Sequence, residues 1–157
     1  LPWFMFTLIF LWTPPHFWAL ALYRSGDYQK VGVPMLPNVK GAKRTILEMK
    51  AYSFFLVIIS FAPSIAFNDE IADSRAYYML SLTMLGLGIW YGSTIWRISI
   101  SGEKDEDGKI SGASNSFFVS LLYLALMFIT LVSASFGTTG AILGAMFSVS
   151  SVIWIEK

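Results

Sequence analysis

The sequence predicts an all-α membrane protein, a bundle of transmembrane helices, and three observations carry that prediction. Only 13% of the 157 residues are charged, against about a quarter in an average soluble domain. The mean hydropathy is +0.61, and 55% of the residues are hydrophobic. The apolar residues gather in runs close to the length of about 20 that a helix needs to cross the bilayer. Such a surface has too little polar area to face water, so lipid is the expected solvent.

Five apolar runs are expected to form the helices of a single membrane domain that covers residues 1–157. Their expected bounds are 1–23, 51–67, 77–98, 117–136 and 141–155. The fifth run follows the break Gly137-Thr138-Thr139-Gly140, and it is short enough either to cross the membrane or to lie in its interface. The chain begins at Leu1 inside an apolar run, without the basic segment and cleavage site of a signal peptide, so we expect a piece of a longer protein.

The basic residues predict how the helices are oriented. Ten of the eleven Lys and Arg residues fall on one side of a strictly alternating topology, namely six in residues 24–50, three in residues 97–109, and Lys157. The opposite side holds only Arg75, set among three acids. Because cytoplasmic loops of membrane proteins are enriched in Lys and Arg, residues 24–50 are predicted to be cytoplasmic. The chain has no cysteine, which excludes disulfides, thiolate metal sites and cysteine nucleophiles.

The first helix carries the motif Thr13-Pro14-Pro15-His16. Its two prolines should bend the helix and leave the carbonyls of Phe10 and Leu11 without their helical donors. His16 is expected about two turns, roughly 10 Å, from Tyr23 at the cytoplasmic end. An ionisable residue at that depth is a candidate for a functional site. The alternative is a neutral histidine that donates to a freed carbonyl and repairs the bend, and both readings stay open.

The cytoplasmic end of this helix combines one acid with several cations. If the helix continues, Tyr23 and Asp27 share one face, and Arg24 and Tyr28 share the next. A carboxylate can hold Mg²⁺ that bridges phosphate oxygens, and Arg and Lys can take the remaining phosphate charge. An anionic head group with an apolar tail would fit such a site. The competing interpretation is an ordinary positive-inside loop whose Lys and Arg residues only set topology.

One run of the sequence resembles a known family. The run FLWTPPHFWALALYRSGDYQKVGVPMLPNVKG, from Phe10 to Gly41, resembles the haem O synthases (protohaem IX farnesyltransferases), a group of the UbiA-type intramembrane prenyltransferases, and its bacterial members most. Aromatic, proline, histidine and acidic positions all agree in spacing. Residues 45–136 agree in helix number and loop lengths. The resemblance implies the carboxy-terminal half of a fold of roughly nine transmembrane helices, and the run 141–155 extends beyond the family's usual end.

The resemblance also implies the site. Such enzymes carry two acidic motifs on cytoplasmic loops, which together hold Mg²⁺ and a prenyl diphosphate. The first motif, N-x-x-x-D-x-x-x-D, is absent from this chain, and the second falls at residues 23–30. Asp27, Arg24 and Tyr28 are expected to be catalytic, with Asp27 as the Mg²⁺ ligand. The expected substrate-binding residues are Lys30, Tyr23, His16, Lys40, Lys43 and Arg44. Trp12, Phe17, Trp18 and Tyr23 are expected to shield the developing allylic cation.

The activity implied is transfer of the farnesyl group of farnesyl diphosphate to a vinyl group of haem B, which makes haem O for terminal oxidase assembly. Haem B is then a substrate rather than a cofactor. The expected surroundings are the bacterial inner membrane, with farnesyl diphosphate, haem B and the lipid bilayer as partners and no nucleic acid. Contact with haem A synthase or with oxidase assembly factors is a further expectation. This chain alone is expected to be inactive, because the first acidic motif is missing.

Two alternatives come from other classes of protein. In a transporter half, the Pro14-Pro15 bend would be a broken helix that lines a permeation path, and His16 a proton relay. In a non-catalytic haem-binding membrane subunit, His16 would be an axial ligand. Such subunits usually pair histidines on facing helices, whereas this chain has one histidine in all.

Overall fold

The computed structural model describes residues 2–63, 74–99 and 110–156. These residues are mainly helical, and the predicted all-α membrane bundle is confirmed. The helices in chain order are α1 (Pro2–Tyr23), α2 (Ser25–Lys30), α3 (Leu36–Ser60), α5 (Ser74–Trp96), α6 (Ala113–Ala134) and α7 (Gly137–Ile155). The acids at 69–73 and the basic residues Lys104, Lys109 and Lys157, which entered the orientation argument, lie outside the described residues.

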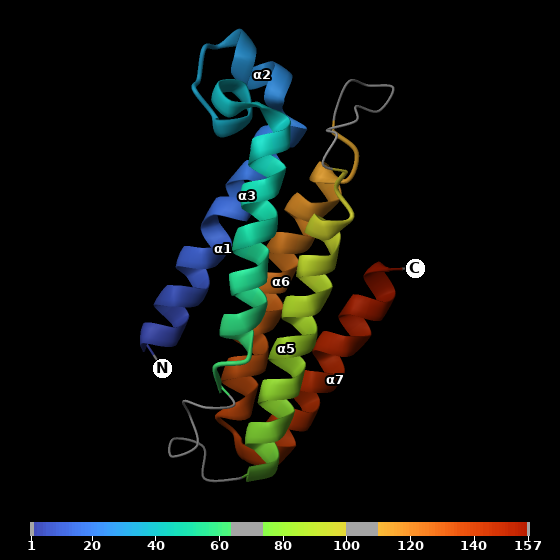
Figure 1. The fold of residues 1–157 in the computed structure, drawn as a ribbon. Helices are drawn as coiled ribbons and strands as arrows, with labels where there is room; N and C mark the ends of the chain where they lie inside the picture. The colour runs from blue at the N-terminus through green and yellow to red at the C-terminus, as the bar shows by residue number, and fades with distance from the viewer. Residues whose placement is uncertain (1, 64–73, 100–109, 157) are drawn as a thin grey trace.

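Four long helices form a ring, to which α7 is added on one side (Figure 1). In this ring α1 packs against α3, α3 against α5, α5 against α6, and α6 back against α1, while α7 packs against both α5 and α6. The short helix α2 contacts α1 and α3 at one end of the ring. The core of the bundle consists of fully buried apolar side chains from all four ring helices, including Leu22, Ile46, Met49, Leu56, Met84, Ile95 and Met127.

The second helix begins much earlier than expected from the apolar run 51–67. α3 starts at Leu36 and ends at Ser60, and residues 64–67 of the run lie outside the described part of the chain. A hydropathy pattern indicates only the part of a helix that lies in lipid. The turns of α3 before residue 51 contain charged residues, so the pattern did not include them. Those turns are stabilised locally by an ion pair of 2.6 Å between Arg44 and Glu48, four residues apart on one helix face.

Two breaks in the backbone separate residues 24–40, here called the cap, from the long helices. Arg24, between α1 and α2, has φ −109° and ψ 27°, outside the helical region. Gly41 interrupts α3 with φ 81° and ψ 159°, a conformation open essentially to glycine alone. The helix after this break is tied back by Thr45, whose hydroxyl donates to the Gly41 carbonyl at 3.0 Å. The cap is therefore a compact helical piece attached at two points.

The other long helices start three or four residues before their expected bounds, at Ser74, Ala113 and Gly137. Within the described residues α1, α6 and α7 are long and apolar enough to cross a membrane, so the fifth run qualifies as a span. α3 and α5 are more polar. α5 can carry polar residues because α3, α6 and α7 pack around it. Its Ser81, Tyr91 and Thr94 are buried.

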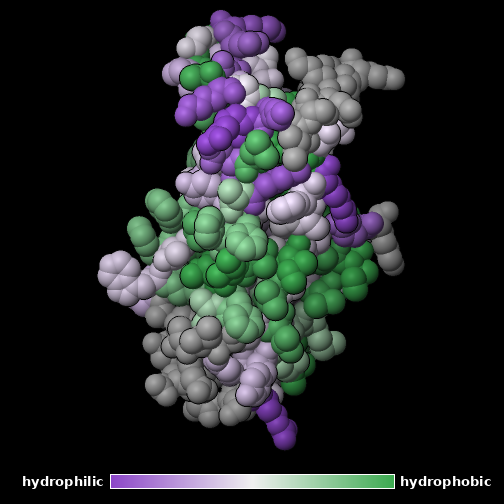
Figure 2. Space-filling view, viewed as in Figure 1, coloured by the Kyte–Doolittle hydropathy of each residue, from purple (hydrophilic) through white to green (hydrophobic). Residues whose placement is uncertain are grey.

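Hydropathy divides the surface into zones (Figure 2). On the face shown, hydrophilic residues gather at the end of the molecule where α2 lies, and hydrophobic residues form a zone across the helices below it. Large exposed side chains contribute to this apolar surface on every spanning helix, among them Phe6 and Phe10 on α1, Val132 on α6, and Leu143 and Phe147 on α7. A soluble protein rarely exposes contiguous apolar surface of this extent. The chain is thus a multi-pass membrane protein.

Small residues let α7 approach α6 closely. An added Cβ at Gly140 would collide with the Ser133 carbonyl oxygen, and one at Gly144 would lie 2.6 Å from the Ser133 Cβ atom. One turn along, the hydroxyls of Thr130 and Ser148 share a hydrogen bond of 3.0 Å. Helices in lipid associate through such close packing and interhelical hydrogen bonds, because the lipid tails give no hydrophobic driving force.

Two glycines of helix α5, Gly86 and Gly88, differ in their surroundings. Gly88 is packed against α3, where an added Cβ would lie 2.7 Å from the Ser60 hydroxyl oxygen. Gly88 therefore allows α5 to pack closely against α3. At Gly86 an added Cβ would have no atom within 4 Å, so this glycine makes no such close contact. Gly86 instead borders an apolar groove between α5 and α7.

The α6–α7 contact yields the first prediction. Gly140→Ala should lower the free energy of unfolding by about 1–3 kcal/mol, because the new methyl group overlaps the backbone of Ser133. Gly86→Ala is the matched control, since its methyl group enters open space and alanine favours the helix by about 1 kcal/mol. Unfolding in mixed detergent micelles, followed by tryptophan fluorescence, measures both variants. An equal loss of stability in the two would contradict this account of the contact.

Candidate functional site

The junction between α1 and the cap positions the predicted acidic motif. α1 ends at Tyr23, and the amide of Arg24 still donates to the carbonyl of Leu20 at 2.8 Å. The chain then turns, and the amides of Asp27 and Tyr28 donate to the Arg24 carbonyl at 3.0 and 3.2 Å. The predicted continuous helix is therefore interrupted at Arg24. The short helix α2 still carries Asp27 in its first turn, near the end of α1.

Three of the predicted residues meet at this junction. A guanidinium nitrogen of Arg24 lies 3.7 Å from a carboxylate oxygen of Asp27, and the same guanidinium lies 5.9 Å from the ring centroid of Tyr23. The Arg24 and Asp27 side chains are 58% and 66% exposed. An ion pair so exposed contributes about 1 kcal/mol or less to stability. Both groups can therefore turn toward a phosphate or a metal ion at little cost.

The remaining predicted cations lie on the same end of the molecule. Lys30 at the end of α2, and Lys40 and Lys43 on either side of the Gly41 break, are all exposed. Arg44 is exposed as well but is held by Glu48. Tyr28 is half-buried. This arrangement gives a cationic surface around one acid, consistent with the hydrophilic end seen in Figure 2.

His16 lies away from the cap, inside the contact between α1 and α6. Its ring is sandwiched between Trp12, at 4.4 Å between ring centroids, and Phe117, at 4.9 Å. Its Nδ1 atom shares a hydrogen bond of 2.6 Å with the Ser120 hydroxyl. One of the two readings left open by the sequence had His16 donate to a freed backbone carbonyl, whereas the partner of its Nδ1 atom is a side chain 104 residues away. A small polar residue within the apolar run of α6 was the only signal for it.

The hydrogen bonds of Ser120 fix the tautomer of His16. The Ser120 hydroxyl donates its single hydrogen to the Phe117 carbonyl at 2.5 Å. The hydroxyl must then accept from the imidazole, so the proton of a neutral His16 lies on Nδ1. The Nε2 atom keeps its lone pair. This is the form in which a histidine can bind a metal or accept a proton.

The predicted aromatic wall is not assembled as expected from the sequence. Trp12 faces α6, where its Nε1–H donates to the Ser120 carbonyl at 2.9 Å. Trp18 meets Tyr52 of α3 edge to face at 5.4 Å. Phe17 is half-exposed on the outside of α1. These side chains point in different directions because successive helical positions are about 100° apart, and only Tyr23 lies beside Arg24.

The cap supplies only part of the ligands that a metal site needs. Within residues 2–63, 74–99 and 110–156 no group of three or more His, Asp and Glu side chains is close enough to hold a metal ion. Mg²⁺ is commonly bound by one or two carboxylates together with water and substrate phosphates. Asp27 can supply one such carboxylate, and its exposed neighbours Arg24 and Lys30 suit the phosphates. The donor set thus fits a metal–diphosphate complex completed by other groups.

Comparisons with known proteins agree with this chemistry. Residues 1–110 match the UbiA prenyltransferase family. The chain is 43% identical over 141 residues to a protein named "Protoheme IX farnesyltransferase" from Parvibaculum lavamentivorans, covering 88% of this chain and 41% of that protein. It is 41% identical over 125 residues to "Protoheme IX farnesyltransferase 2" from Mesorhizobium japonicum, covering 79% and 37%. A similar protein from Bordetella pertussis is 40% identical over 127 residues, covering 80% and 38%.

These matches also set the limits of the comparison. The chain spans about two-fifths of the length of the curated relatives it matches. No solved structure matches it. The family match includes α1, the cap, α3 and α5, and so contains every residue of the candidate site on the cap. With more than two-thirds of its residues matched, the chain belongs to the UbiA prenyltransferase family.

Proposed function

We propose that the protein to which this chain belongs transfers the farnesyl group of farnesyl diphosphate to a vinyl group of haem B, giving haem O for terminal oxidase assembly. The observation that carries the proposal is the exposed Arg24–Asp27 pair, set on a cationic cap at the end of an apolar bundle. The relatives named protoheme IX farnesyltransferase supply the identity of the two substrates. In this proposal the chain forms the carboxy-terminal half of the enzyme's membrane domain.

The cap would hold the diphosphate. Asp27 would contribute a carboxylate oxygen to Mg²⁺, and the metal would neutralise charge on the leaving diphosphate. Arg24, released from its loose pair with Asp27, can form paired hydrogen bonds to phosphate oxygens, and Lys30 can add a point charge. Tyr28 and Tyr23 flank these groups and can donate through their hydroxyls. Lys40, Lys43 and Arg44 extend the cationic surface along the start of α3.

The reaction then requires charge stabilisation rather than acid–base catalysis. The bond between farnesyl C1 and the diphosphate oxygen breaks, and its electron pair leaves with the diphosphate. The π electrons of a haem vinyl group form the new carbon–carbon bond to the allylic cation. Water adds to the resulting cation, and loss of one proton leaves the hydroxyl group of haem O. The bundle must keep water from the allylic cation until the new bond has formed.

His16 is proposed to face the haem substrate. Its Nδ1 proton is engaged by Ser120, so Nε2 presents a lone pair. A neutral imidazole held by stacking on both faces could ligate the haem iron through that atom or orient the macrocycle. The depth of His16, about 10 Å below the end of α1, is suited to a substrate whose reactive vinyl group must approach the farnesyl C1 atom.

The cap is proposed to lie in the cytoplasm of a bacterial cell, with the bundle in its inner membrane. The exposed cations of the cap follow the positive-inside rule. The product, haem O, would pass to later steps of oxidase assembly, and contact with haem A synthase or with assembly factors is part of the proposal. The transporter half and the non-catalytic haem-binding subunit are less favoured, because family membership points to prenyl transfer.

A charge-removing substitution tests the site. In the full-length enzyme Asp27→Asn should reduce Mg²⁺-dependent haem O formation by about 10²- to 10³-fold, the scale for loss of one electrostatic contact to a transition state. Glu156→Gln is the control, because it removes one acidic charge at the end of α7, where Glu156 bonds Trp90 and no residue of the cap. Initial rates of haem O formation, measured by chromatography at several Mg²⁺ concentrations, compare the two. Asp27→Asn with the rate of the parent would remove Asp27 from the site.

The isolated 157-residue chain should form no detectable haem O, because the described residues supply only part of the donors that a metal–diphosphate complex needs. Activity should return when the preceding part of the full-length protein is expressed with it as a separate chain. The assay is haem O formation in membranes that contain one or both pieces. A measurable rate from the chain alone would contradict a divided site.

The absence of cysteine allows a direct test of topology. Gln29→Cys in the cap should react with a membrane-impermeant maleimide only from the cytoplasmic side. Ser135→Cys, exposed between α6 and α7 at the other end of the bundle, should react only from the periplasmic side. Labelling of intact cells and of inverted vesicles measures this. Labelling of Gln29→Cys in intact cells would overturn the cytoplasmic placement of the cap.

A further inference from the structure

An apolar groove runs between α5 and α7, on the side of the bundle away from α1 and α3. It has a volume of about 220 Å³. α5 contributes Leu82, Gly86, Leu87 and Trp90, and α7 contributes Val149 and Val152. From Leu82 to Trp90 the groove follows about 12 Å of helix at 1.5 Å per residue. Because Gly86 has no side chain, the space above it is open. In a bilayer such a groove is in reach of lipid hydrocarbon.

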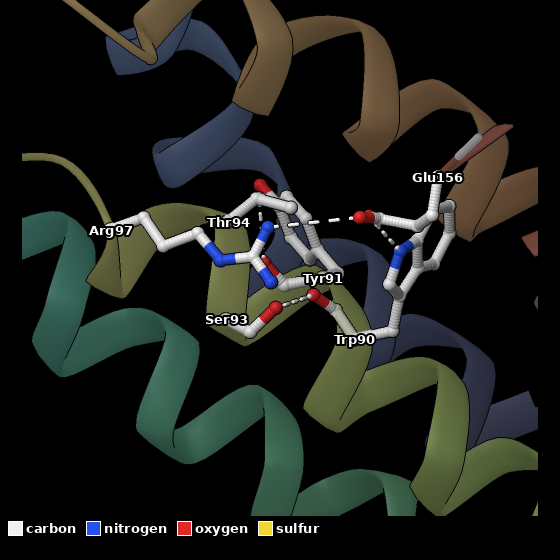
Figure 3. A network of polar contacts seen from close by, with 6 residues as sticks. All are labelled: Trp90, Tyr91, Ser93, Thr94, Arg97 and Glu156. Carbon is white, nitrogen blue, oxygen red and sulfur yellow. Dashed lines mark hydrogen bonds and ion pairs between the residues drawn. The ribbon is translucent and has the colours of Figure 1, made fainter.

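One end of the groove carries a polar network made by three side chains (Figure 3). The Trp90 Nε1–H donates to one carboxylate oxygen of Glu156 at 2.8 Å, and the other oxygen lies 3.7 Å from a guanidinium nitrogen of Arg97. Trp90 lies on α5, and Arg97 directly follows the last residue of that helix. Glu156 directly follows the last residue of α7 (Figure 3). The indole of Trp90 therefore joins the apolar groove to the charged pair.

The ion pair of Arg97 and Glu156 is accessible to solvent, and its contact distance is long. The Arg97 side chain is 67% exposed and the Glu156 side chain 39%. At 3.7 Å their contact is longer than a charge-assisted hydrogen bond of about 2.8 Å, so each group can accept another partner. The pair lies at the end of α5 where Lys50 of α3 also covers the Trp96 ring, at 5.5 Å. Tryptophan and arginine at this level are typical of the membrane interface.

We propose that this groove binds a zwitterionic phospholipid with a primary ammonium group, of the phosphatidylethanolamine type. One acyl chain would lie along α5 and α7 over Gly86. The guanidinium of Arg97 would bind the lipid phosphate, and the lipid ammonium would donate hydrogen bonds to the carboxylate of Glu156. The pair offers one positive and one negative group side by side, which complements this head group. A phosphatidylglycerol head group brings no cation to Glu156, so the charge of its phosphate stays uncompensated beside that carboxylate. A choline head group has no N–H to donate.

The groove is distinct from the candidate site on the cap, and the proposal does not depend on the proposed function. A prenyl diphosphate would place two or three negative charges beside Glu156, which a single arginine cannot balance. Among the described residues the cap offers several exposed cations for that purpose, and the polar end of the groove offers Arg97. Charge complementarity therefore assigns the diphosphate to the cap and the neutral, dipolar head group to the groove.

Native mass spectrometry of the detergent-purified full-length protein, equilibrated with equal amounts of phosphatidylethanolamine, phosphatidylcholine and phosphatidylglycerol, tests the proposal. We expect phosphatidylethanolamine to be retained about three- to five-fold over the other two, the scale of one exposed ion pair. Glu156→Gln keeps an acceptor for Trp90 but removes the charge, and it should bring this preference close to one. Preferential retention of phosphatidylglycerol, or no preference in the parent chain, would overturn the proposal.

Filling the groove gives an independent test that leaves the charged pair in place. Gly86→Leu should reduce phosphatidylethanolamine retention at least about three-fold, because its side chain occupies the space of the acyl chain. Ala125→Leu adds similar bulk at an exposed position on α6 and is the matched control. Thermal melting of both variants verifies that the bundle is intact. Undiminished retention by folded Gly86→Leu, or displacement of the lipid by added farnesyl diphosphate, would refute a phospholipid groove.

Discussion

The hydrocarbon solvent imposes the constraint on which the rest of this structure depends: a polar group inside the bilayer must find its partner within the protein. The backbone satisfies this demand by forming helices, and several buried polar side chains satisfy it by pairing between helices. His16 reaches Ser120 across α1 and α6, the Tyr123 hydroxyl lies 3.3 Å from Ser60 across α6 and α3, and Thr130 reaches Ser148 across α6 and α7. These contacts specify which helices are neighbours.

Helix α6 is the common member of these contacts. Ser120 alone accepts from Trp12 through its carbonyl and from His16 through its hydroxyl, so one residue of α6 holds two side chains of α1. The rings of Tyr91 and Tyr123 stack at 5.0 Å and join α5 to the same part of α6. The apolar core around them adds contact area but little direction, because apolar contacts are non-directional. Polar pairs and small residues therefore determine the register of the bundle.

Hydropathy and charge predicted the helical membrane bundle and the common position of the cations, because both depend on local composition. They could not predict that α3 extends back to Leu36, since a helix outside lipid need not be apolar. Nor could they predict the partner of His16, which lies 104 residues away, or the separation of Trp12 from Trp18. Such features depend on which helices meet. The short-range pairing of Arg24 with Asp27 was accessible because three residues of spacing bring them together.

The two breaks that bound the cap have a mechanical consequence. Residues 24–40 join the membrane helices through one residue with non-helical backbone angles at each side, Arg24 and Gly41. Among the described elements α2 contacts α1 and α3. A change in the tilt of this piece needs only rotations about the backbone bonds of those two joints. The helices in the bilayer can keep their packing meanwhile. Such rotations would move Asp27, Lys30 and Lys40 relative to His16, which is held between Trp12 and Phe117 in the bundle.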